Sequence, residues 1–442
     1  MRIQVYTTAM RFSFPFFLAF ALCWTGFARA NDWPHFLGPT WNFHSAETNL
    51  NLEFPVEGPR KLWEFPKGKG HAGPVVVDDL VVLIHQVDEE EVIHCLDAKT
   101  GKVKWEHRYP VQVDQSYGIT DTPRSSPTVD LETKTVYTLG NDGDLIAFEL
   151  KKGKIAWKMK LSEEFGEAPF FFGQGSCPLV YKDKLIVHVG APGACVVALD
   201  KKNGKVIWKA AHQWNGSYAS PVIADINGQD KLMVFAGGMV KPPHGGLLCI
   251  DPEDGTIHDS FSWRSTNFAS VNAATPVPCG PNRVFITEDY GKGGVMLYYD
   301  SNFSSRVEWT SQDFGCQFQT PIYHEGYLYG FGGTGGLLLC YEVATGRLRW
   351  SETFLRLTIP WEGRELPINL GKGSLVHADG GFLCLGENGT LLRLSFTPEA
   401  GAAVLAKAQL FYAPETWAPP VVANGRLYVN QNEMGSRLVC YD

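Results

Sequence analysis

Short apolar stretches alternate with turn residues along almost all of the chain. Residues 135–139 and 145–148 are two such stretches, and Gly140-Asn141-Asp142-Gly143-Asp144 lies between them. Apolar runs of this length bounded by Gly, Asn and Asp predict short β-strands joined by tight turns. The same order recurs, and each unit is predicted to contain four strands, with a glycine hairpin before the fourth.

The hairpin before the fourth strand carries the most regular motif. Residues 95–105 read Cys-Leu-Asp-Ala-Lys-Thr-Gly-Lys-Val-Lys-Trp, and the same Gly-to-Trp spacing returns at Trp157, Trp208 and Trp350. Trp309 keeps the spacing without the Gly, and Asp259 takes the Trp position of another copy. Glycine supplies the positive φ of a tight corner. A Trp in the same phase of most units is expected to pack against the neighbouring unit rather than to bind a ligand.

A proline at the start of an apolar stretch is the second mark of the repeat. It recurs in phase with the Gly-to-Trp motif. Its intervals are about 40 to 55 residues, which is typical of propeller blades. Proline is tolerated at the first residue of a strand, where no ladder donor is lost. Counting Leu375 of Ser374-Leu375-Val376 as an equivalent without proline, there are eight marks: Pro74, Pro127, Pro178, Pro221, Pro276, Pro321, Leu375 and Pro420.

The two ends of the repeat region complete one unit. Cys440-Tyr441-Asp442 aligns with Cys95-Leu96-Asp97, one strand short of a full unit, and Trp63 occupies the missing Trp position near the other end. We therefore predict an all-β, eight-bladed β-propeller of four-stranded antiparallel blades, whose N-terminal strand closes the last blade and removes a free sheet edge. The predicted domains are a signal peptide over 1–30, a loop-like segment over 31–57 and the propeller over 58–442.

The first thirty residues predict export. Arg2 and Arg11 precede the apolar run 12–27, and Ala28-Arg29-Ala30 is a small-x-small cleavage site. We expect a periplasmic or secreted protein with no transmembrane segment after cleavage. The net charge of −8 and the absence of a basic block argue against nucleic acid as a partner. We expect a monomer.

Nine cysteines follow the predicted cleavage site. Four of them, Cys95, Cys249, Cys340 and Cys440, share a repeat position that is Ala147 or Ala198 elsewhere, which indicates a small buried position. No CxxC or CxxCH occurs, so neither a zinc knuckle nor a c-type haem is predicted. Disulfides remain possible in an exported protein, although an odd count leaves one thiol unpaired.

The repeat AxDxxTGxxxW, as in residues 198–208, resembles the quinoprotein-type (PQQ-like) propeller repeat. Residues 33–39, 272–277, 371–375 and 417–421 are similar to a family of secreted bacterial propellers related to BamB, the outer-membrane assembly lipoprotein. The resemblance implies the fold. For function it leaves open an assembly scaffold or a quinone-dependent dehydrogenase. The dehydrogenases typically stack their quinone on a vicinal disulfide, and this chain has no adjacent cysteines.

Other chemistries find little support. No GxSxG occurs, and His324-Glu325 lacks the second His of a zinc protease motif. Residues 225–230 alternate oxygen-bearing side chains as a calcium loop does, but they fall where a hairpin turn is expected. We predict no catalytic residues, no metal site and no cofactor. Pyrroloquinoline quinone with calcium is kept as the alternative.

Repeat symmetry predicts where a ligand would bind. Positions just before the strand-opening proline should ring one mouth of the central channel, and they differ from blade to blade. Their cations, amides and aromatic rings suit a polar or anionic ligand with a flat or sugar-like face, although they could equally plug the channel. The candidate residues are His71, Arg124, Gln174, Tyr218, Asn272, Gln317, Phe318, Lys372 and Trp417.

Two longer connections interrupt the repeat and offer a partner surface. One contains Phe170, Phe171 and Phe172, and the other contains Trp361 and Arg364. Aromatic and Arg side chains are favoured in protein interfaces, although such loops could also fold back over the ring. We therefore expect a non-catalytic binding protein or interaction scaffold at the cell envelope, for an envelope protein, a carbohydrate or a small ligand. The alternative is a PQQ-dependent alcohol or sugar dehydrogenase acting at the channel mouth.

Overall fold

The computed structural model describes residues 1, 32–50, 53–112, 121–168, 170–238, 241–267, 270–333 and 336–442. The chain separates into two compact units, Met1–Ala30 and Asn31–Asp442. All described residues except Met1 belong to the second unit, so the predicted signal peptide lies outside the described residues. No helix in the described ranges is long and apolar enough to cross a membrane.

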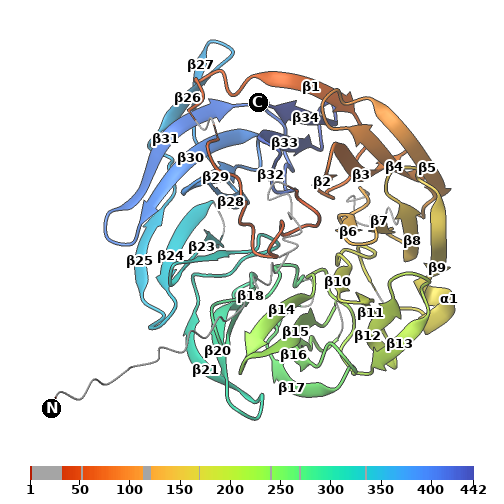
Figure 1. Cartoon of the computed structure of the whole chain (residues 1–442). Helices are drawn as coiled ribbons and strands as arrows, with labels where there is room; N and C mark the ends of the chain where they lie inside the picture. The colour runs from red at the N-terminus through yellow and green to blue at the C-terminus, as the bar shows by residue number, and fades with distance from the viewer. Residues whose placement is uncertain are drawn as a thin grey trace. The chain divides into compact units, whose positions relative to one another are not determined.

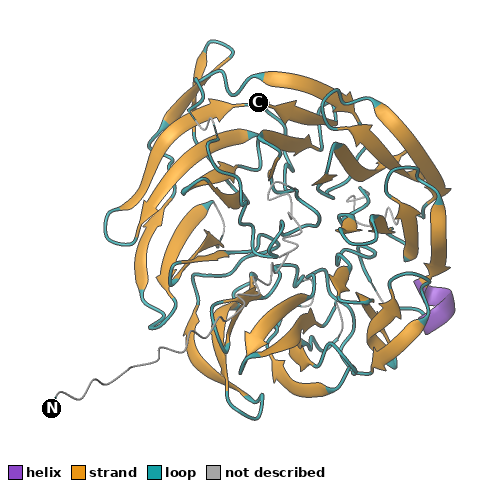
Figure 2. Cartoon of the chain, viewed as in Figure 1, coloured by secondary structure: helices purple, strands orange, loops and turns teal. Residues whose placement is uncertain are grey.

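The second unit is an eight-bladed β-propeller, as predicted. Eight four-stranded antiparallel sheets surround a central axis, and each runs from a short inner strand to an outer strand at the rim (Figure 1). Strands make up nearly all of the regular structure, and α1 (Leu161–Phe165) is a single short helix between blades 2 and 3 (Figure 2). The blades are numbered in chain order.

Blade 1 consists of β2 (Val75–Val77), β3 (Leu80–Val87), β4 (Glu90–Asp97) and β5 (Val103–Pro110), and blade 2 of β6 (Thr128–Asp130), β7 (Thr135–Leu139), β8 (Asp144–Glu149) and β9 (Ile155–Lys160). Blade 3 consists of β10 (Leu179–Tyr181), β11 (Lys184–Ala191), β12 (Ala194–Asp200) and β13 (Val206–Ala210), and blade 4 of β14 (Val222–Ile226), β15 (Gln229–Ala236), β16 (Gly246–Ile250) and β17 (Ile257–Ser262).

Blade 5 consists of β18 (Val277–Pro278), β19 (Arg283–Glu288), β20 (Gly293–Tyr299) and β21 (Ser305–Ser311), and blade 6 of β22 (Ile322–His324), β23 (Tyr327–Gly332), β24 (Leu337–Glu342) and β25 (Leu348–Glu352). Blade 7 consists of β28 (Ser374–Ala378), β29 (Gly381–Leu385), β30 (Thr390–Thr397) and β31 (Gly401–Gln409), and blade 8 of β32 (Val421–Ala423), β33 (Arg426–Gln431), β34 (Arg437–Tyr441) and β1 (Lys61–Pro66). A two-stranded hairpin, β26 (Thr358–Trp361) and β27 (Arg364–Pro367), is inserted between blades 6 and 7.

Strand β1 closes the ring as the sequence predicted. It pairs antiparallel with β34, and Trp63 lies opposite Cys440, just as Trp105 lies opposite Cys95 in blade 1. The salt bridge between Arg60 and Asp442 joins the chain at the same place. The last blade therefore has its fourth strand, and the edge of β34 that β1 covers is paired.

The repeated Trp packs against the next blade, as predicted. Its indole N–H donates to a backbone carbonyl there. In five of the six described pairs its ring also lies over that blade's hairpin glycine, where an added Cβ would come within 2.4–2.8 Å of the ring; the exception is Trp350, since Gly401 has nothing within 4 Å. The glycine is therefore required by a neighbour as well as by its positive φ. The donor–acceptor pairs, at 2.8–3.2 Å, are Trp63–Ala98, Trp105–Leu150, Trp157–Lys201, Trp208–Pro252, Trp309–Val343 and Trp350–Thr397.

A hydrogen-bonded belt joins the inner strands of blades 1 to 6. It uses the residue immediately before each proline, whose backbone N–H donates to the side chain of the equivalent residue in the next blade. Such bonds satisfy buried backbone donors that no sheet partner reaches. The chain of donors and acceptors, at 2.9–3.2 Å, runs Gly73, Ser126, Cys177, Ser220, Thr275 and Thr320.

The segment 32–50 lies across the far ends of several inner strands. Trp33 pairs with Val76 in β2, and His44 forms a parallel bridge with His377 in β28. The Glu47 carboxylate accepts the N–H of Gly425 beside β32. Trp33 is almost fully buried. This segment therefore covers the channel at the end opposite the strand-opening prolines, near the centre of Figure 1.

The nine cysteines among the described residues are all buried free thiols. In six sheets the small residue opposite the Trp is Cys or Ala, as for Ala198 opposite Trp208; in one of the six, Asp259 stands in for the Trp. The suspected calcium loop is a hairpin turn between β14 and β15, in which Asn227 and Gly228 both have positive φ. That geometry is typical of a two-residue turn and accounts for its Asn and Gly.

Candidate functional site

A cavity of about 390 Å³ opens at the mouth formed by the starts of the inner strands. All eight residues that stand three before the proline, or its equivalent, line it. Because these residues are related by the propeller axis, their side chains converge although they are spread over most of the chain. They are His71, Arg124, Gly175, Tyr218, Ala273, Phe318, Lys372 and Trp417.

One wall of the cavity is aromatic and carries a cation. The Trp417 indole stacks on the His71 imidazole, with 4.8 Å between ring centroids, and Phe318 packs against Trp417 at the same distance. The Lys372 ammonium lies 5.3 Å from the Phe318 centroid and 5.5 Å from that of Trp417. Cation–π contacts at these distances stabilise the ammonium without neutralising its charge.

A second part of the wall is built around Arg124. Its guanidinium donates to the Phe172 carbonyl at 2.8 Å and lies over the Phe172 ring. The Tyr218 hydroxyl accepts the N–H of Phe172 at 3.1 Å. Burial lowers the pKa of Arg124 and raises that of Tyr218. An arginine remains charged despite such a shift, so both parts of the wall present a positive charge.

The floor of the cavity comes from outside the repeat. Phe36 and Phe43, from the segment that covers the far end of the channel, both line it. They pack edge to face, with 5.4 Å between centroids. The channel is therefore a cup rather than an open pore. Its rim comes from the blades and its base from the N-terminal segment.

The other predicted residues lie close to the cavity in different roles. Gln317 lines it and donates to the Tyr290 hydroxyl at 2.7 Å. Gln174 and Asn272 do not line it. The Asn272 amide is fully buried and donates to the Ala236 carbonyl, and Gln174 is buried beside a neighbouring groove. Gln317 stands at the same repeat position as these two residues, so the repeat phase alone does not decide which of the three side chains reaches the cavity.

Two carboxylates beside the cavity were missed at the sequence level. One ligand atom each of His71, Asp121 and Glu415 lies within 4.8 Å of the others, and His71 Nε2 is 3.7 Å from Asp121 Oδ2. Burial lowers the pKa of His71 to about 3, so its imidazole is neutral. Burial, and then the nearby Asp121, raise the pKa of Glu415. The ring of repeat-equivalent positions contains no acid, but the loops beside it bring two.

The connection that contains Phe170, Phe171 and Phe172 folds back toward the channel mouth. All three rings are half-buried. Phe170 packs against Gly216, where an added Cβ would meet its ring, and Phe172 lines the cavity. The loop is thus part of the wall around the mouth, and its use as a partner surface stays a prediction.

Trp361 and Arg364 pair across the turn of the β26–β27 hairpin. The hairpin is held to blade 7 by the buried Ile359 and by a hydrogen bond from Lys407 to the Thr358 carbonyl. Arg364 is exposed and Trp361 half-buried. The hairpin lies on the outside of the ring, away from the labelled inner strands (Figure 1). Its use as a partner surface also stays a prediction.

Much of the chain matches a known protein family. Residues 56–229 and 119–352, which overlap, match the family described as outer membrane protein assembly factor BamB. The chain belongs to this family. The match covers most of the propeller, and with the eight blades it shows that this member of the BamB family is a PQQ-like propeller.

The relatives of this BamB-family chain include enzymes. The lanthanide-dependent methanol dehydrogenase of Methylacidiphilum fumariolicum (strain SolV) is 28% identical over 209 residues, which is 45% of this chain and 30% of that enzyme. The chain therefore matches less than a third of that enzyme's length.

Solved structures resemble the chain in fold alone. BamB from Moraxella catarrhalis has a TM-score of 0.57 at 14% identity and covers 86% of this chain and 97% of its own. A europium-containing methanol dehydrogenase has a TM-score of 0.64 at 16% identity, with 92% and 91% covered. The quinohemoprotein alcohol dehydrogenase of Comamonas testosteroni has a TM-score of 0.55 at 15% identity, with 94% and 81% covered.

Proposed function

We propose that this protein is an exported, non-catalytic binding propeller whose channel mouth takes a flat or sugar-like small ligand that carries a carboxylate or phosphate. The observation that supports this most is the cavity whose lining combines Lys372 and Arg124 with aromatic rings. Ligand pockets are typically apolar with a few placed polar groups, and this cavity has that character.

The two positive charges of the lining argue for an anion. Lys372 has cation–π contacts and no ion pair among the described residues, and Arg124 donates to a neutral carbonyl. An anionic group between them would gain charge-assisted hydrogen bonds, which are about twice as strong as neutral ones. The indole of Trp417 and the ring of Phe318 would add stacking area for a flat face.

A dehydrogenase is the second candidate function. It is favoured by the group of His71, Asp121 and Glu415, which offers three ligand atoms to a cation, and by the lanthanide-dependent relative. The residues fit a flat tricarboxylate such as pyrroloquinoline quinone, because Arg124 and Lys372 would pair with its carboxylates and Trp417 would stack on its rings. When bound, this quinone supplies the two-electron acceptor for oxidation of an alcohol.

The two functions are separated by titrating the purified chain with pyrroloquinoline quinone and with glucuronate, by calorimetry, with and without Ca²⁺ or La³⁺. Lys372→Met is expected to weaken binding about tenfold or more, the equivalent of one charge-assisted bond. Lys292→Met is the matched control, since Lys292 lies 4.0 Å from the Trp263 centroid outside the cavity. Its affinity should equal that of the wild type.

Dye-coupled oxidation of methanol and glucose is then measured on the loaded protein. Binding without turnover supports the binding function. Turnover that Asp121→Asn abolishes would replace it with the dehydrogenase. Failure of the quinone and of glucuronate to bind, or equal binding by Lys372→Met, would overturn the assignment of the cavity.

An envelope location is part of the same proposal. It rests on the predicted signal peptide over 1–30 and on membership of a family described as an outer membrane assembly factor. Fractionation of cells that express the full-length chain, followed by N-terminal sequencing of the product, tests it. A product that begins after Ala30 in the periplasmic or extracellular fraction is expected. An uncleaved cytoplasmic product would contradict export.

A further inference from the structure

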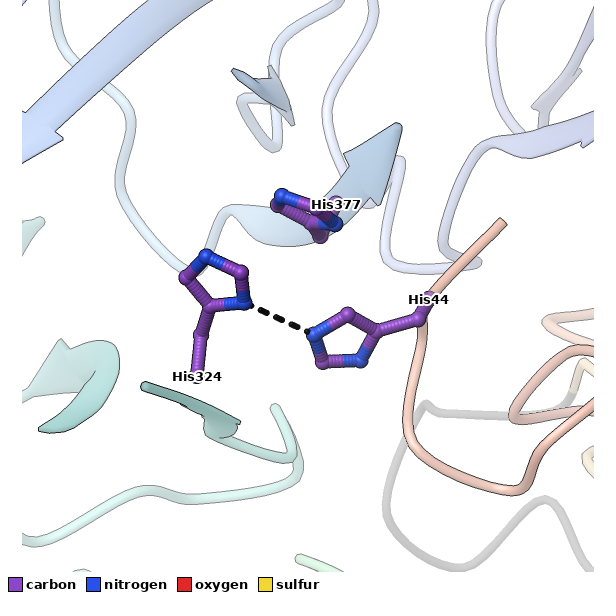
Figure 3. A group of neighbouring side chains, drawn as sticks. All are labelled: His44, His324 and His377. Atoms are coloured by element: carbon purple, nitrogen blue, oxygen red, sulfur yellow. Dashed lines mark hydrogen bonds between the residues drawn. The ribbon is translucent and has the colours of Figure 1, made fainter. Parts of the chain in front are cut away.

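Three histidines meet at the covered end of the channel, on the side away from the cavity mouth. His44 comes from the N-terminal segment, His324 ends β22 in blade 6, and His377 lies in β28 of blade 7. Their imidazoles point toward one another in Figure 3, and one ring nitrogen of each lies within 4.8 Å of those of the other two. All three are half-buried.

The spacing of the nitrogens suits a tetrahedral metal. His44 Nε2 and His324 Nδ1 are 3.3 Å apart, the contact drawn in Figure 3. Zinc–nitrogen bonds of about 2.0–2.1 Å in a tetrahedron place two ligand nitrogens about 3.3–3.4 Å apart. Two of the three ligands therefore already have the required separation. A small rotation of the His377 ring, whose centroid is 4.2 Å from that of His324, would bring in the third.

One of the rings is oriented by a group behind it. His44 Nδ1 is 3.0 Å from the Asn42 carbonyl, which holds the proton on Nδ1 and leaves the Nε2 lone pair facing the cluster. His324 Nδ1 faces His44, and its Nε2 lies 3.9 Å from the exposed Glu325 carboxylate, which is beyond hydrogen-bond distance. A carbonyl or carboxylate behind a histidine is the usual outer shell of a metal ligand, because it selects the tautomer and orients the ring.

Two of the rings, those of His44 and His377, favour the neutral form that binds metal. Burial, and then the two neighbouring histidines, lower the pKa of His377 to about 4, and burial lowers that of His44. A neutral imidazole supplies its lone pair without the cost of deprotonation.

We propose that His44, His324 and His377 bind one divalent transition-metal ion of the zinc class. Three nitrogens leave a fourth position, and because the rings are only half-buried, water or an added ligand reaches it. The ion would join the N-terminal segment to blades 6 and 7. It would do so beside the backbone hydrogen bond from Ser45 to the His377 carbonyl, and so hold in place the segment that forms the cavity floor.

The test uses tag-free full-length protein, stripped with a chelator and titrated with Zn²⁺ and with Co²⁺. We expect about one equivalent of zinc to remain after gel filtration, and cobalt to give the intense visible bands of a tetrahedral site. His377→Ala and His44→Gln should each lower the retained zinc at least about tenfold, as loss of one ligand does. His212→Ala is the matched control, because His212 is half-buried against Trp214 and lies outside the cluster.

Stability separates a lost ligand from a lost fold. Zinc should raise the Tm of the wild type and of His212→Ala but not that of His377→Ala, and the three metal-free proteins should melt cooperatively. Zinc should also slow proteolytic cleavage within 32–57 in the wild type. The proposal is overturned if the wild type retains no zinc, or if His377→Ala and His44→Gln retain as much zinc and give the same cobalt spectrum as the wild type.

Discussion

Glu91 is a carboxylic acid with no exposed surface, at the start of β4. The Tyr109 hydroxyl donates to it at 2.8 Å, and the N–H of Asn141 in blade 2 donates to it at 3.1 Å. Burial nevertheless raises its pKa to about 7, because two neutral donors do not replace the lost hydration of a charge. Glu91 is thus an acid that the fold keeps protonated in weakly acidic solution.

This predicts a specific dependence of stability on pH. The folded pKa lies above the unfolded value of 4.5, so the contribution of Glu91 is fully present below pH 4.5 and is lost as pH rises through about 7. The loss is at most about 3 kcal/mol, at 1.36 kcal/mol per pKa unit. Glu91→Gln should therefore match the wild type near pH 4 and exceed it above pH 7.5. Urea unfolding between pH 4 and pH 8.5 measures this.

The difference in unfolding free energy between Glu91→Gln and the wild type reports on Glu91 alone, because other titrating groups are the same in both proteins. Burial lowers the pKa of His35 to about 3, so its contribution is present above pH 6.5 and is lost as pH falls. That contribution is common to both proteins and cancels. Glu89→Gln, at an exposed position two residues away, should show no such change. A pH-independent difference for Glu91→Gln would contradict the prediction.

At the scale of the element, blades are joined by the Trp and glycine of successive hairpins. An added Cβ at Gly204 would lie 2.8 Å from the Trp157 ring of the preceding blade. Gly204 also has a φ of +74°. Gly204→Ala should destabilise the protein by about 1 kcal/mol for the left-handed backbone and a further 1–3 kcal/mol for the overpacked indole.

A matched control separates the two costs. Gly228 has a φ of +70°, and an added Cβ there meets nothing within 4 Å. Gly228→Ala should therefore show only the backbone cost in urea unfolding. Equal losses for the two variants would mean that the indole contact contributes nothing to the choice of glycine at Gly204.

The belt of hydrogen bonds between inner strands makes a second prediction at this scale. The Thr275 hydroxyl accepts the N–H of Ser220, and the Thr275 N–H donates to Thr320. Thr275→Val keeps the shape but leaves the buried Ser220 N–H without an acceptor, which should cost about 1–3 kcal/mol. Thr310→Val, at an exposed position of β21, should change the free energy of unfolding by less than about 0.5 kcal/mol. If Thr275→Val and Thr310→Val changed the free energy of unfolding equally, the belt would not contribute to stability.

At the scale of the whole molecule, β1 decides whether the ring closes. Without it β34 would present a free edge of backbone donors and acceptors, a template for pairing with another copy. A chain truncated to 53–442 retains β1, whereas 67–442 lacks it. We expect 53–442 to remain monomeric in light scattering and 67–442 to form oligomers with a lower Tm. Monomeric 67–442 with an unchanged Tm would show that closure does not depend on β1.

The repeat phase alone determined a large part of this architecture. Prolines and hairpin tryptophans recur with the blade, and a propeller relates equivalent positions by rotation about its axis. The sequence therefore predicted eight blades and closure by Trp63 and its strand, and the eight positions that stand three before the proline or its equivalent line one cavity. The serines and threonines of the belt also recur with the repeat, immediately before the prolines, but the sequence pattern alone did not indicate their hydrogen bonds.

What only the tertiary structure decided lies outside the repeat phase. Asp121 and Glu415 stand in loops, and His44 in the N-terminal segment, where no periodicity predicts a neighbour. His324 and His377 end up beside His44 because the segment crosses the ring and bridges to β28, a contact set by packing across more than three hundred residues of sequence. Repeats specify positions by symmetry, whereas these groups are brought together by long-range contacts that a local pattern does not encode.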